Sequence, residues 1–258
     1  MKTNIESSLS DGVLHLTFSS NDGLNTMDDH WFALLESKLH DATDDRTVRA
    51  VLLSGHGRAF CAGANIVGMR KSALHHGFSG SPLARLIERL MAFPKPLVAA
   101  VHGQALGGGA TLLLHCDLVV AAADTQFRFP FTLLGAVPEF ASSFLLPRAA
   151  GSRLASELLL LGNTFDAEKA MRAGIVNELV SPGEELALAL QWATHLASLA
   201  PDSVQMTKRL LGEAQRSNLP LFIAREGEAL VRTLSSGEVK EATSAFLEKR
   251  RPDFTPFH

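Results

Sequence analysis

Stretches of apolar residues separated by polar turns recur along the first two thirds of the chain, and their spacing predicts alternating strands and helices. Alternating or continuous runs of about 4–8 apolar residues predict strands, and apolar residues that recur every three to four positions predict helices. The expected strands cover residues 13–18, 48–54, 97–101, 118–122 and 175–180. The expected helices cover residues 31–39, 83–91, 110–116, 152–161 and 166–174, with Asp28 or Asp29, Ser152 and Asp166 as caps.

From Glu184 onward the pattern is almost entirely helical, with breaks at Pro201, Pro220 and residues 235–237. Strands that alternate with helices, followed by a helical end, predict an α/β fold. No stretch rich in Pro, Gly or Ser divides the 258 residues, so one continuous domain is expected. Residues 48–64 and 97–109 also resemble each other loosely, because each has a strand followed by a glycine-containing turn.

Composition narrows the class of protein. With 46% apolar and 20% charged residues the chain is globular, and its net charge of −3 gives no general attraction to nucleic acid. The first ten residues lack the apolar segment of a secretory signal, which favours a cytoplasmic location. Polar residues and glycines interrupt the most apolar stretch, residues 97–123, so we expect no membrane span. Cys61 and Cys116 have no metal-type spacing and are expected to be reduced, buried thiols, and no metal site is expected.

Two small-residue turns are the first candidates for chemistry. Residues 107–109 are three glycines between an expected strand and an expected helix, where the backbone can approach a ligand and free N–H groups point outward. Residues 59–66 lead into another expected helix in the same way. N–H groups from both turns would form an oxyanion hole if they converged on one oxygen. The alternative is that both are packing turns.

Four other groups have chemistry-bearing side chains. His115, Cys116 and Asp117 are the residue types of a nucleophilic triad, but adjacent residues point in different directions, which favours a structural role. His75 and His76 are expected in the loop with residues 77–80 and not at a metal. Ser142 and Ser143 could be a helix cap or could provide a nucleophile, and the cap is favoured. The basic residues 249–251 could complement a helix dipole or contact a CoA phosphate.

The chain resembles the crotonase (enoyl-CoA hydratase/isomerase) family over almost its whole length. The matching segments, in the family's order, are residues 59–66, 105–110, 116–121, 129–151 and 245–250. The resemblance implies a crotonase-like spiral of ββα units in residues 1–195 and a helical trimerisation region in residues 196–258. It also implies a homotrimer or a dimer of trimers, and an acyl-CoA substrate with no separate cofactor.

The family's functional residues map onto individual positions here. The resemblance implies oxyanion donors at the N–H groups of Ala64 and Gly108. The remaining implied positions contact CoA: Ala62, Ala64 and Val67 beside the adenine, and Phe246 and Lys249 at the CoA of the adjoining subunit. Asn65 and Val67 differ from the residues that the family often has there, an acidic residue and a lysine, which puts these local CoA contacts in doubt.

Departures from the family pattern bear on the reaction. The two glutamates of the family's hydratases are replaced by Thr111 and Phe131, whereas Glu139 resembles the single base of the 3-enoyl-CoA to 2-enoyl-CoA isomerases. Apolar neighbours such as Phe140 and Phe144 would raise the pKa of Glu139 by desolvation, although a Glu after a Pro is otherwise usually an exposed loop residue. Residues 69–81 and 83–91 are expected to shape the acyl pocket. The leading hypothesis is an enoyl-CoA isomerase; the alternatives are a hydratase, another lyase or hydrolase of the family, and a catalytically silent acyl-CoA binder.

Overall fold

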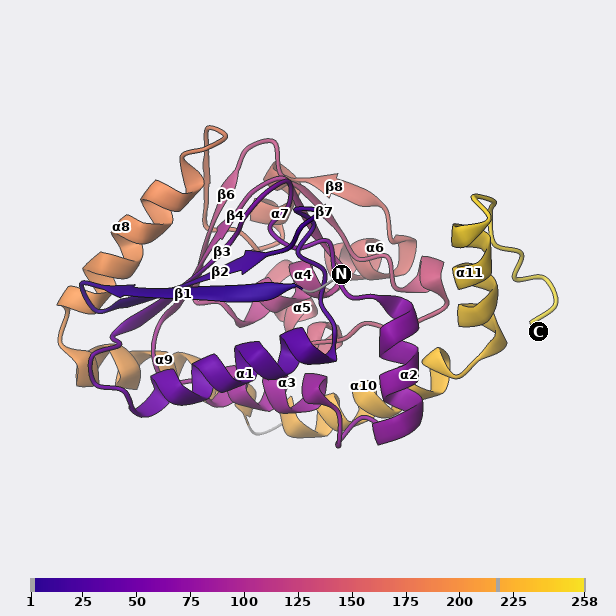
Figure 1. Cartoon of the computed structure of the whole chain (residues 1–258), viewed down its shortest axis with the longest axis horizontal. Coiled ribbons are helices and arrows are strands. Elements are labelled where there is room, and N and C mark those ends of the chain that lie inside the picture. The colour runs from indigo at the N-terminus through magenta and orange to yellow at the C-terminus, as the bar shows by residue number, and fades with distance from the viewer. Residues whose placement is uncertain (1–2, 217–218, 258) are drawn as a thin grey trace.

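Two β-sheets form the centre of the computed structural model, which describes residues 3–216 and 219–257 (Figure 1). The larger sheet has the order β1-β2-β3-β4-β6-β9; β1 is antiparallel to β2 and the other neighbours are parallel. The smaller sheet has the order β5-β7-β8. The strands of the larger sheet are β1 (Asn4–Ser10), β2 (Val13–Ser19), β3 (Ala50–Gly55), β4 (Leu97–Val101), β6 (Leu118–Ala122) and β9 (Glu178–Val180); those of the smaller are β5 (Gln104–Leu106), β7 (Gln126–Arg128) and β8 (Thr164–Asp166).

Helices surround these sheets. The α-helices are α1 (Asp29–Asp44), α2 (Ile66–His76), α3 (Pro82–Ala92), α4 (Gly108–Thr111), α5 (Ser142–Ala150), α6 (Ser152–Leu161), α7 (Ala167–Arg172), α8 (Glu185–Ser198), α9 (Pro201–Arg216), α10 (Leu219–Leu234) and α11 (Gly237–Leu247). Two 3₁₀ segments, η1 (Leu112–His115) and η2 (Thr132–Leu134), complete the set. Figure 1 shows α8 on one side of the larger sheet, α1 and α3 on the other, and α11 at the edge of the molecule.

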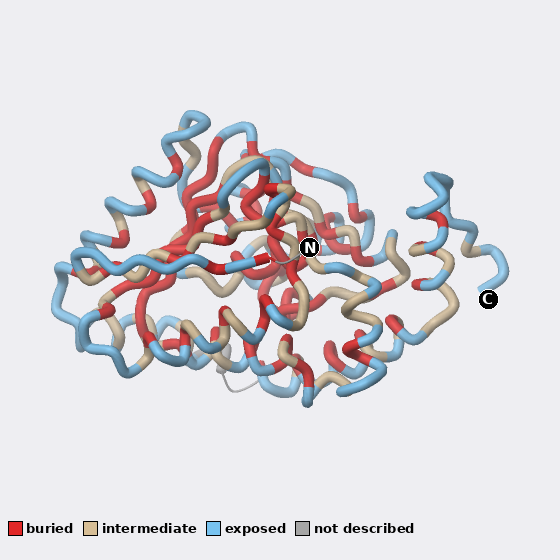
Figure 2. The backbone as a smooth tube through the Cα atoms, viewed as in Figure 1, coloured by how far each residue is buried: buried red, intermediate tan, exposed pale blue. Residues whose placement is uncertain are grey.

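The central strand β4 is apolar at every position because both of its faces are covered. All five of its residues are buried. Val98 and Ala100 pack against α8, whereas Ala99 and Val101 belong to the main core on the opposite face. Figure 2 shows this buried zone running through the sheet, while α8 and α11 keep exposed outer faces. Parallel strands buried on both sides have such continuous apolar sequences.

The α/β prediction is confirmed, and so are the helical C-terminal region and its breaks near Pro201 and at residues 235–236. Pro220 lies in the first turn of α10, and the chain just before that helix, residues 217–218, falls outside the described residues. Asp28 and Asp166 cap α1 and α7 as expected, accepting hydrogen bonds from Trp31 N and Lys169 N. The prediction that Ser152 caps a helix was wrong. Gly151 occupies the N-cap position of α6, and its φ of 76° lies in a region that glycine adopts without strain.

Several element boundaries also differ from the prediction. The expected strand 175–180 shortens to Glu178–Val180, and the expected helix 110–116 divides into α4 and the 3₁₀ segment η1. His75 and His76 end helix α2 instead of lying in the following loop, because the helix continues until Gly77 takes a φ of 63°. Within residues 3–216 and 219–257, every helix is too short or too polar to cross a membrane.

Candidate active site

The two small-residue turns lie side by side in the structure. Cys61 N donates to Gln104 O at 3.1 Å, and Leu106 N donates to Cys61 O at 3.0 Å, so the segments pair like two parallel strands. A Cβ on Gly109 would lie 2.3 Å from Cys61 O. No other residue fits there without moving the backbone, so the glycine permits the close approach of the two turns.

The N–H of Ala64 is left free by the way this residue pairs. Met27 N donates to Gly63 O at 2.9 Å, and Asn65 N donates to Met27 O at 3.1 Å. In a parallel bridge of this kind the residue between the two bonded groups turns its own N–H and C=O away from the partner. Across the described residues, the Ala64 N–H has no hydrogen-bond acceptor.

Gly108 offers a second free N–H. It is the first residue of α4, so its N–H precedes the first hydrogen bond within the helix. The preceding Gly107 has a φ of 50°, and its own N–H donates to Arg128 O at 2.9 Å. No group in the described part of the chain accepts a hydrogen bond from Gly108 N. Both amides predicted to hold an oxyanion are therefore available to a ligand.

The carboxyl group of Glu139 lies next to this second amide. A Cβ on Gly108 would lie 2.8 Å from Glu139 Oε1. The Glu139 side chain is buried, and its Oε2 has no hydrogen-bond partner in the parts of the chain that the structure describes. Burial raises the pKa of this carboxyl to about 8, and the nearby carboxylate of Glu226 acts in the same direction. Glu139 is therefore desolvated, as predicted from its apolar neighbours. The alternative, an exposed carboxylate in a loop, does not apply.

One cavity brings the two turns and Glu139 together. Its empty volume is about 640 Å³, part of it open to solvent, and Ala62, Ala64, Gly108 and Glu139 all line it. Its remaining lining residues are Gly63, Ile66, Met69, Leu106, Gly107, Arg128, Pro130, Phe131, Leu134, Ala136, Val137, Leu230 and Leu234. Among the described residues that line it, Glu139 is the one acidic side chain.

The two positions that lack a glutamate carry no replacement carboxylate. Phe131 faces the cavity with an aromatic ring. Thr111 is buried, and its hydroxyl donates to Gly107 O at 3.2 Å, which occupies it within the turn. A single carboxyl group beside two free amides can shuttle one proton but leaves no second carboxylate to orient a water molecule.

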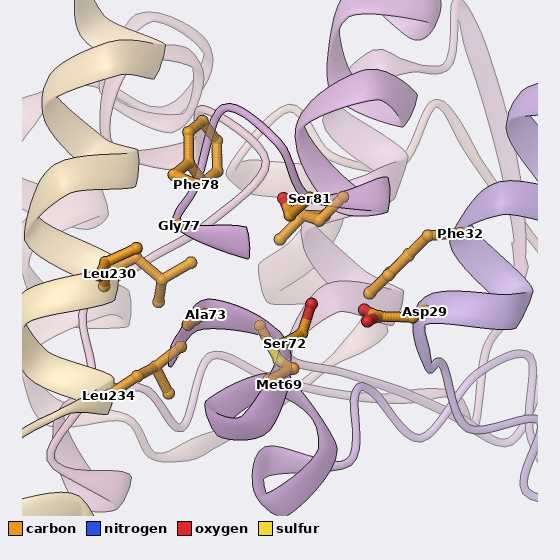
Figure 3. Close-up of a pocket in the computed structure, with 12 residues that line it drawn as sticks. Asp29, Phe32, Met69, Ser72, Ala73, Gly77, Phe78, Ser81, Leu230 and Leu234 are labelled. Atoms are coloured by element: carbon orange, nitrogen blue, oxygen red, sulfur yellow. The ribbon is translucent and has the colours of Figure 1, made fainter. Parts of the chain in front are cut away.

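A smaller cavity adjoins the first. Figure 3 shows its walls: Met69, Ser72 and Ala73 on α2, Phe78 in the following loop, and Leu230 and Leu234 on α10. Met69, Leu230 and Leu234 line both cavities. Residues from 69–81, together with Leu83, thus line a space that adjoins the cavity of Glu139, as expected for residues that shape an acyl pocket.

The three remaining predicted CoA contacts do not line the cavity of Glu139 in the single chain. The side chain of Val67 is 45% exposed on α2, and that of Phe246 is 76% exposed on α11. Lys249 follows α11 with a left-handed φ of 55°. Its neighbour Arg250 is engaged in ion pairs with Glu241 and Glu248. Phe246 and Lys249 were expected to act on an adjoining subunit, so their exposure here fits that expectation without testing it.

The triad alternative fails on geometry. His115 Nε2 lies 2.8 Å from Phe140 O, and Asp117 Oδ2 accepts hydrogen bonds from Leu97 N and Lys208 Nζ. The Cys116 thiol is 3.9 Å from Leu112 O. Each side chain has its own separate partner, so the three are structural. Across residues 3–216 and 219–257, no three His, Cys, Asp or Glu side chains are grouped so that they could hold a metal ion.

Neither serine after Glu139 caps a helix, which corrects the prediction. Ala141 holds the N-cap position of α5 and has no side-chain oxygen. The Ser142 hydroxyl donates to Glu139 O at 2.6 Å, and the Ser143 hydroxyl donates to Glu226. The cap is supplied from a different helix, by the carboxylate of Glu226.

Glu226 is the residue of this site that sequence reasoning missed. The sequence contains one sign of its role: it falls on the apolar stripe of α10 between Ile223 and Leu230, where a charged residue is unusual. Burial raises its pKa to about 7, even though hydrogen bonds from Ser143 and Ala141 act in the opposite direction. Its partners were not visible in the sequence, because they lie more than 80 positions away.

Known proteins are similar to this chain over almost its whole length. The family model "Enoyl-CoA hydratase/isomerase" matches residues 8–256. A 1,2-epoxyphenylacetyl-CoA isomerase of Escherichia coli is 36% identical over 249 residues, 95% of each chain, and a 2,3-dehydroadipyl-CoA hydratase of the same organism is 34% identical over 242 residues, 94% of each. A crystal structure of an enoyl-CoA hydratase/isomerase from Pseudoalteromonas atlantica is 37% identical and superposes with a TM-score of 0.90, covering 97% of this chain and 99% of the other.

Proposed function

Because this chain belongs to the enoyl-CoA hydratase/isomerase (crotonase) family, we propose that it moves the double bond of a 3-enoyl-CoA to the 2-position. The observation that carries the proposal is the position of Glu139, a buried carboxyl next to the free amide of Gly108 in a cavity whose described lining has no other acid.

The first step is binding of the thioester oxygen. The N–H groups of Ala64 and Gly108 both lack protein acceptors among the described residues and line the same cavity. Two such donors stabilise the negative charge that develops on the oxygen when the thioester becomes an enolate. Because both belong to the backbone of packed turns, little reorganisation accompanies the reaction.

Glu139 then transfers a single proton. Its carboxylate removes a proton from C2 of the 3-enoyl group, and the electrons of that C–H bond delocalise over the double bond and the thioester as a dienolate. The resulting carboxylic acid returns the proton at C4, which leaves the double bond between C2 and C3 and restores the carboxylate. A pKa near the working pH suits a group that must both accept and donate the proton.

The same geometry disfavours hydration. Addition of water needs a group that positions the water as well as one that supplies the proton, and Thr111 and Phe131 provide no carboxylate for this. Glu226, the other buried carboxylate nearby, is occupied by the backbone of α5. The hydratase reading rests on relatives such as the dehydroadipyl-CoA hydratase and remains the alternative that the experiment decides.

CoA and other subunits complete the proposal. The acyl group would lie against Met69, Leu230 and Leu234, and the CoA chain would leave past Ala62. A trimer, or a dimer of trimers, would bring Phe246 and Lys249 of α11 and its C-terminal end to the CoA of a neighbouring subunit. The support is that α11 carries an exposed Phe246 and lies at the edge of the monomer (Figure 1).

Paired assays test the reaction. The purified protein is given a 3-enoyl-CoA, and formation of the conjugated product is followed by its ultraviolet absorption; a 2-enoyl-CoA is given separately, and loss of that absorption by hydration is followed. We expect isomerisation well above hydration. In Glu139→Gln, which keeps the shape but removes the base, isomerisation is expected to fall about 10²-fold to 10⁴-fold.

The outcomes separate the alternatives. Efficient hydration by the wild type would favour the hydratase, and a wild-type isomerisation rate in Glu139→Gln would remove Glu139 from the mechanism. CoA binding without either activity would favour a silent binder or another reaction of the family. Glu228→Gln, which removes an exposed carboxylate on α10, is the control and is expected to behave as the wild type.

A further inference from the structure

The segment that follows Glu139 has an unusual backbone. Phe140 and Ala141 have φ values of 57° and 56°, in the left-handed region that residues with a Cβ rarely occupy. Two such residues in succession cost free energy, and this conformation persists only where the surroundings hold it. The turn they form directs the Glu139 side chain toward Gly108, so whatever holds the turn also places the carboxyl group.

Glu226 supplies three of the polar contacts that hold this turn, and Ser142 adds two more, from its N–H and its hydroxyl to Glu139 O. Glu226 Oε1 accepts a hydrogen bond from Ala141 N at 2.6 Å, and its Oε2 accepts one from Ser143 N at 3.0 Å and another from the Ser143 hydroxyl. These N–H groups are the otherwise unbonded donors at the start of α5. Phe140 has contacts of its own. His115 Nε2 hydrogen-bonds with its carbonyl, and its ring packs near Phe32, with the two ring centroids 6.2 Å apart.

We propose that Glu226 is a positioning residue, which fixes the left-handed turn of Phe140 and Ala141 from helix α10 and so holds the Glu139 carboxyl beside the Gly108 amide. The inference rests on the proposed role of Glu139 as the base. Glu226 itself does not line the cavity, and each of its oxygens is already occupied by backbone donors of α5.

Glu226 also acts on Glu139 through charge. Its carboxylate makes ionisation of Glu139 less favourable and is the second cause, after burial, of the raised pKa of that group. Two further titratable groups near the pair are neutral near pH 7, because burial lowers the pKa of His115 to about 4 and raises that of Cys61 to about 12.

Three arginines on the elements packed around the pair have backbone carbonyl partners. Arg70 of α2 donates to Leu234 O, Arg148 of α5 donates to Phe144 O, and Arg128 of β7 donates to Gly162 O. Carbonyl acceptors leave the three guanidinium groups charged, and the charge that acts on the pKa of Glu139 is that of Glu226.

Glu226→Gln tests both actions. Gln has one acceptor oxygen, so its amide N–H₂ must face an N–H donor that Glu226 now satisfies, and the turn loosens. We expect the maximal isomerisation rate at high pH to fall about 10-fold to 100-fold with little change in KM. Loss of the like charge should also move the acid limb of the pH–rate profile down by about one pH unit. The variant would therefore lose less activity at pH 6 than at pH 9.

Glu226→Asp separates position from charge. It keeps the negative charge but is too short to reach both Ala141 N and Ser143 N, so the rate should fall while the acid limb stays near that of the wild type. Glu228→Gln, on the exposed face of the same helix, is the matched control and should leave both unchanged. Melting temperatures of all variants show how much of any loss comes from unfolding.

A readout without turnover keeps this inference distinct from the proposed function. In protein labelled with ¹³C-glutamate, the carboxyl resonance of Glu139, assigned by its loss in Glu139→Gln, is titrated in the wild type and in Glu226→Gln. A lower pKa in the variant supports the inference even if the wild type does not isomerise 3-enoyl-CoA. An unchanged pKa and an unchanged rate, or a loss of rate that only follows the melting temperature, would overturn it.

Discussion

Replacing Glu139 by Gln should make the protein more stable at alkaline pH although it strongly slows proton transfer. The structure buries Glu139 and raises its pKa from 4.5 to about 8. Between these two values the unfolded chain has already lost the proton that the folded protein still holds. The free energy of unfolding of the wild type therefore decreases as the pH rises through this window.

The size of the effect follows from that window. Each unit of pKa difference corresponds to about 1.4 kcal/mol, so the whole interval amounts to a few kcal/mol, which water entry and local relaxation reduce. The Gln amide does not titrate, and it is buried in the same place. The variant should thus be close to the wild type near pH 4.5 and exceed it by an amount that grows up to about pH 8.

Urea unfolding at a fixed protein concentration, from pH 5 to pH 8.5, measures this difference. Glu226 titrates in both proteins, so the comparison isolates position 139 to first order. Glu228→Gln controls for the loss of a carboxylate as such. A stability difference that stays constant over the whole pH range would show that the pKa of Glu139 is not raised, and the account of this residue as a base tuned by burial would fail.

Three further predictions concern the cavity and the assembly. Gly108→Ala should lower turnover far more than it lowers the melting temperature, because its Cβ would lie 2.8 Å from Glu139 Oε1. Gly68→Ala is the control and should remain active, because its Cβ would meet its nearest atom at 3.9 Å. Met69→Ala should join the two cavities and raise kcat/KM for longer 3-enoyl-CoA chains relative to shorter ones, whereas an unchanged preference would place the acyl chain elsewhere. Light scattering at micromolar concentration should give a trimer or hexamer mass and not the 27.7 kDa of one chain.

The parts of the fold that the sequence predicted are those governed by local rules. Continuous apolar runs predicted β3, β4 and β6, and the spacing of apolar residues and prolines predicted the C-terminal helices. The strand β1 was missed because its residues are mostly polar and exposed, and it is held by pairing with β2 rather than by its own apolar pattern.

For the site, the sequence indicated the two turns and Glu139 but not what holds them. The free N–H of Ala64 depends on Met27, which pairs with the residues on either side of it, and no local rule predicts that pairing. Likewise, the serines after Glu139 have the residue type of helix caps, but Glu226 takes that role from a distant helix. Partners joined only by the tertiary fold leave no short-range pattern.

The two amides that would bind the thioester oxygen have a consequence for how such a protein changes over evolutionary time. Because the donors at Ala64 and Gly108 are main-chain groups, substitution of most neighbouring side chains leaves them in place. In the proposed mechanism, the groups that decide what happens to the enolate are side chains at a few positions, 111, 131 and 139, on separate segments. A duplicated gene could therefore acquire a new reaction by one or two substitutions at these positions, while the electrophilic half of the site is inherited intact.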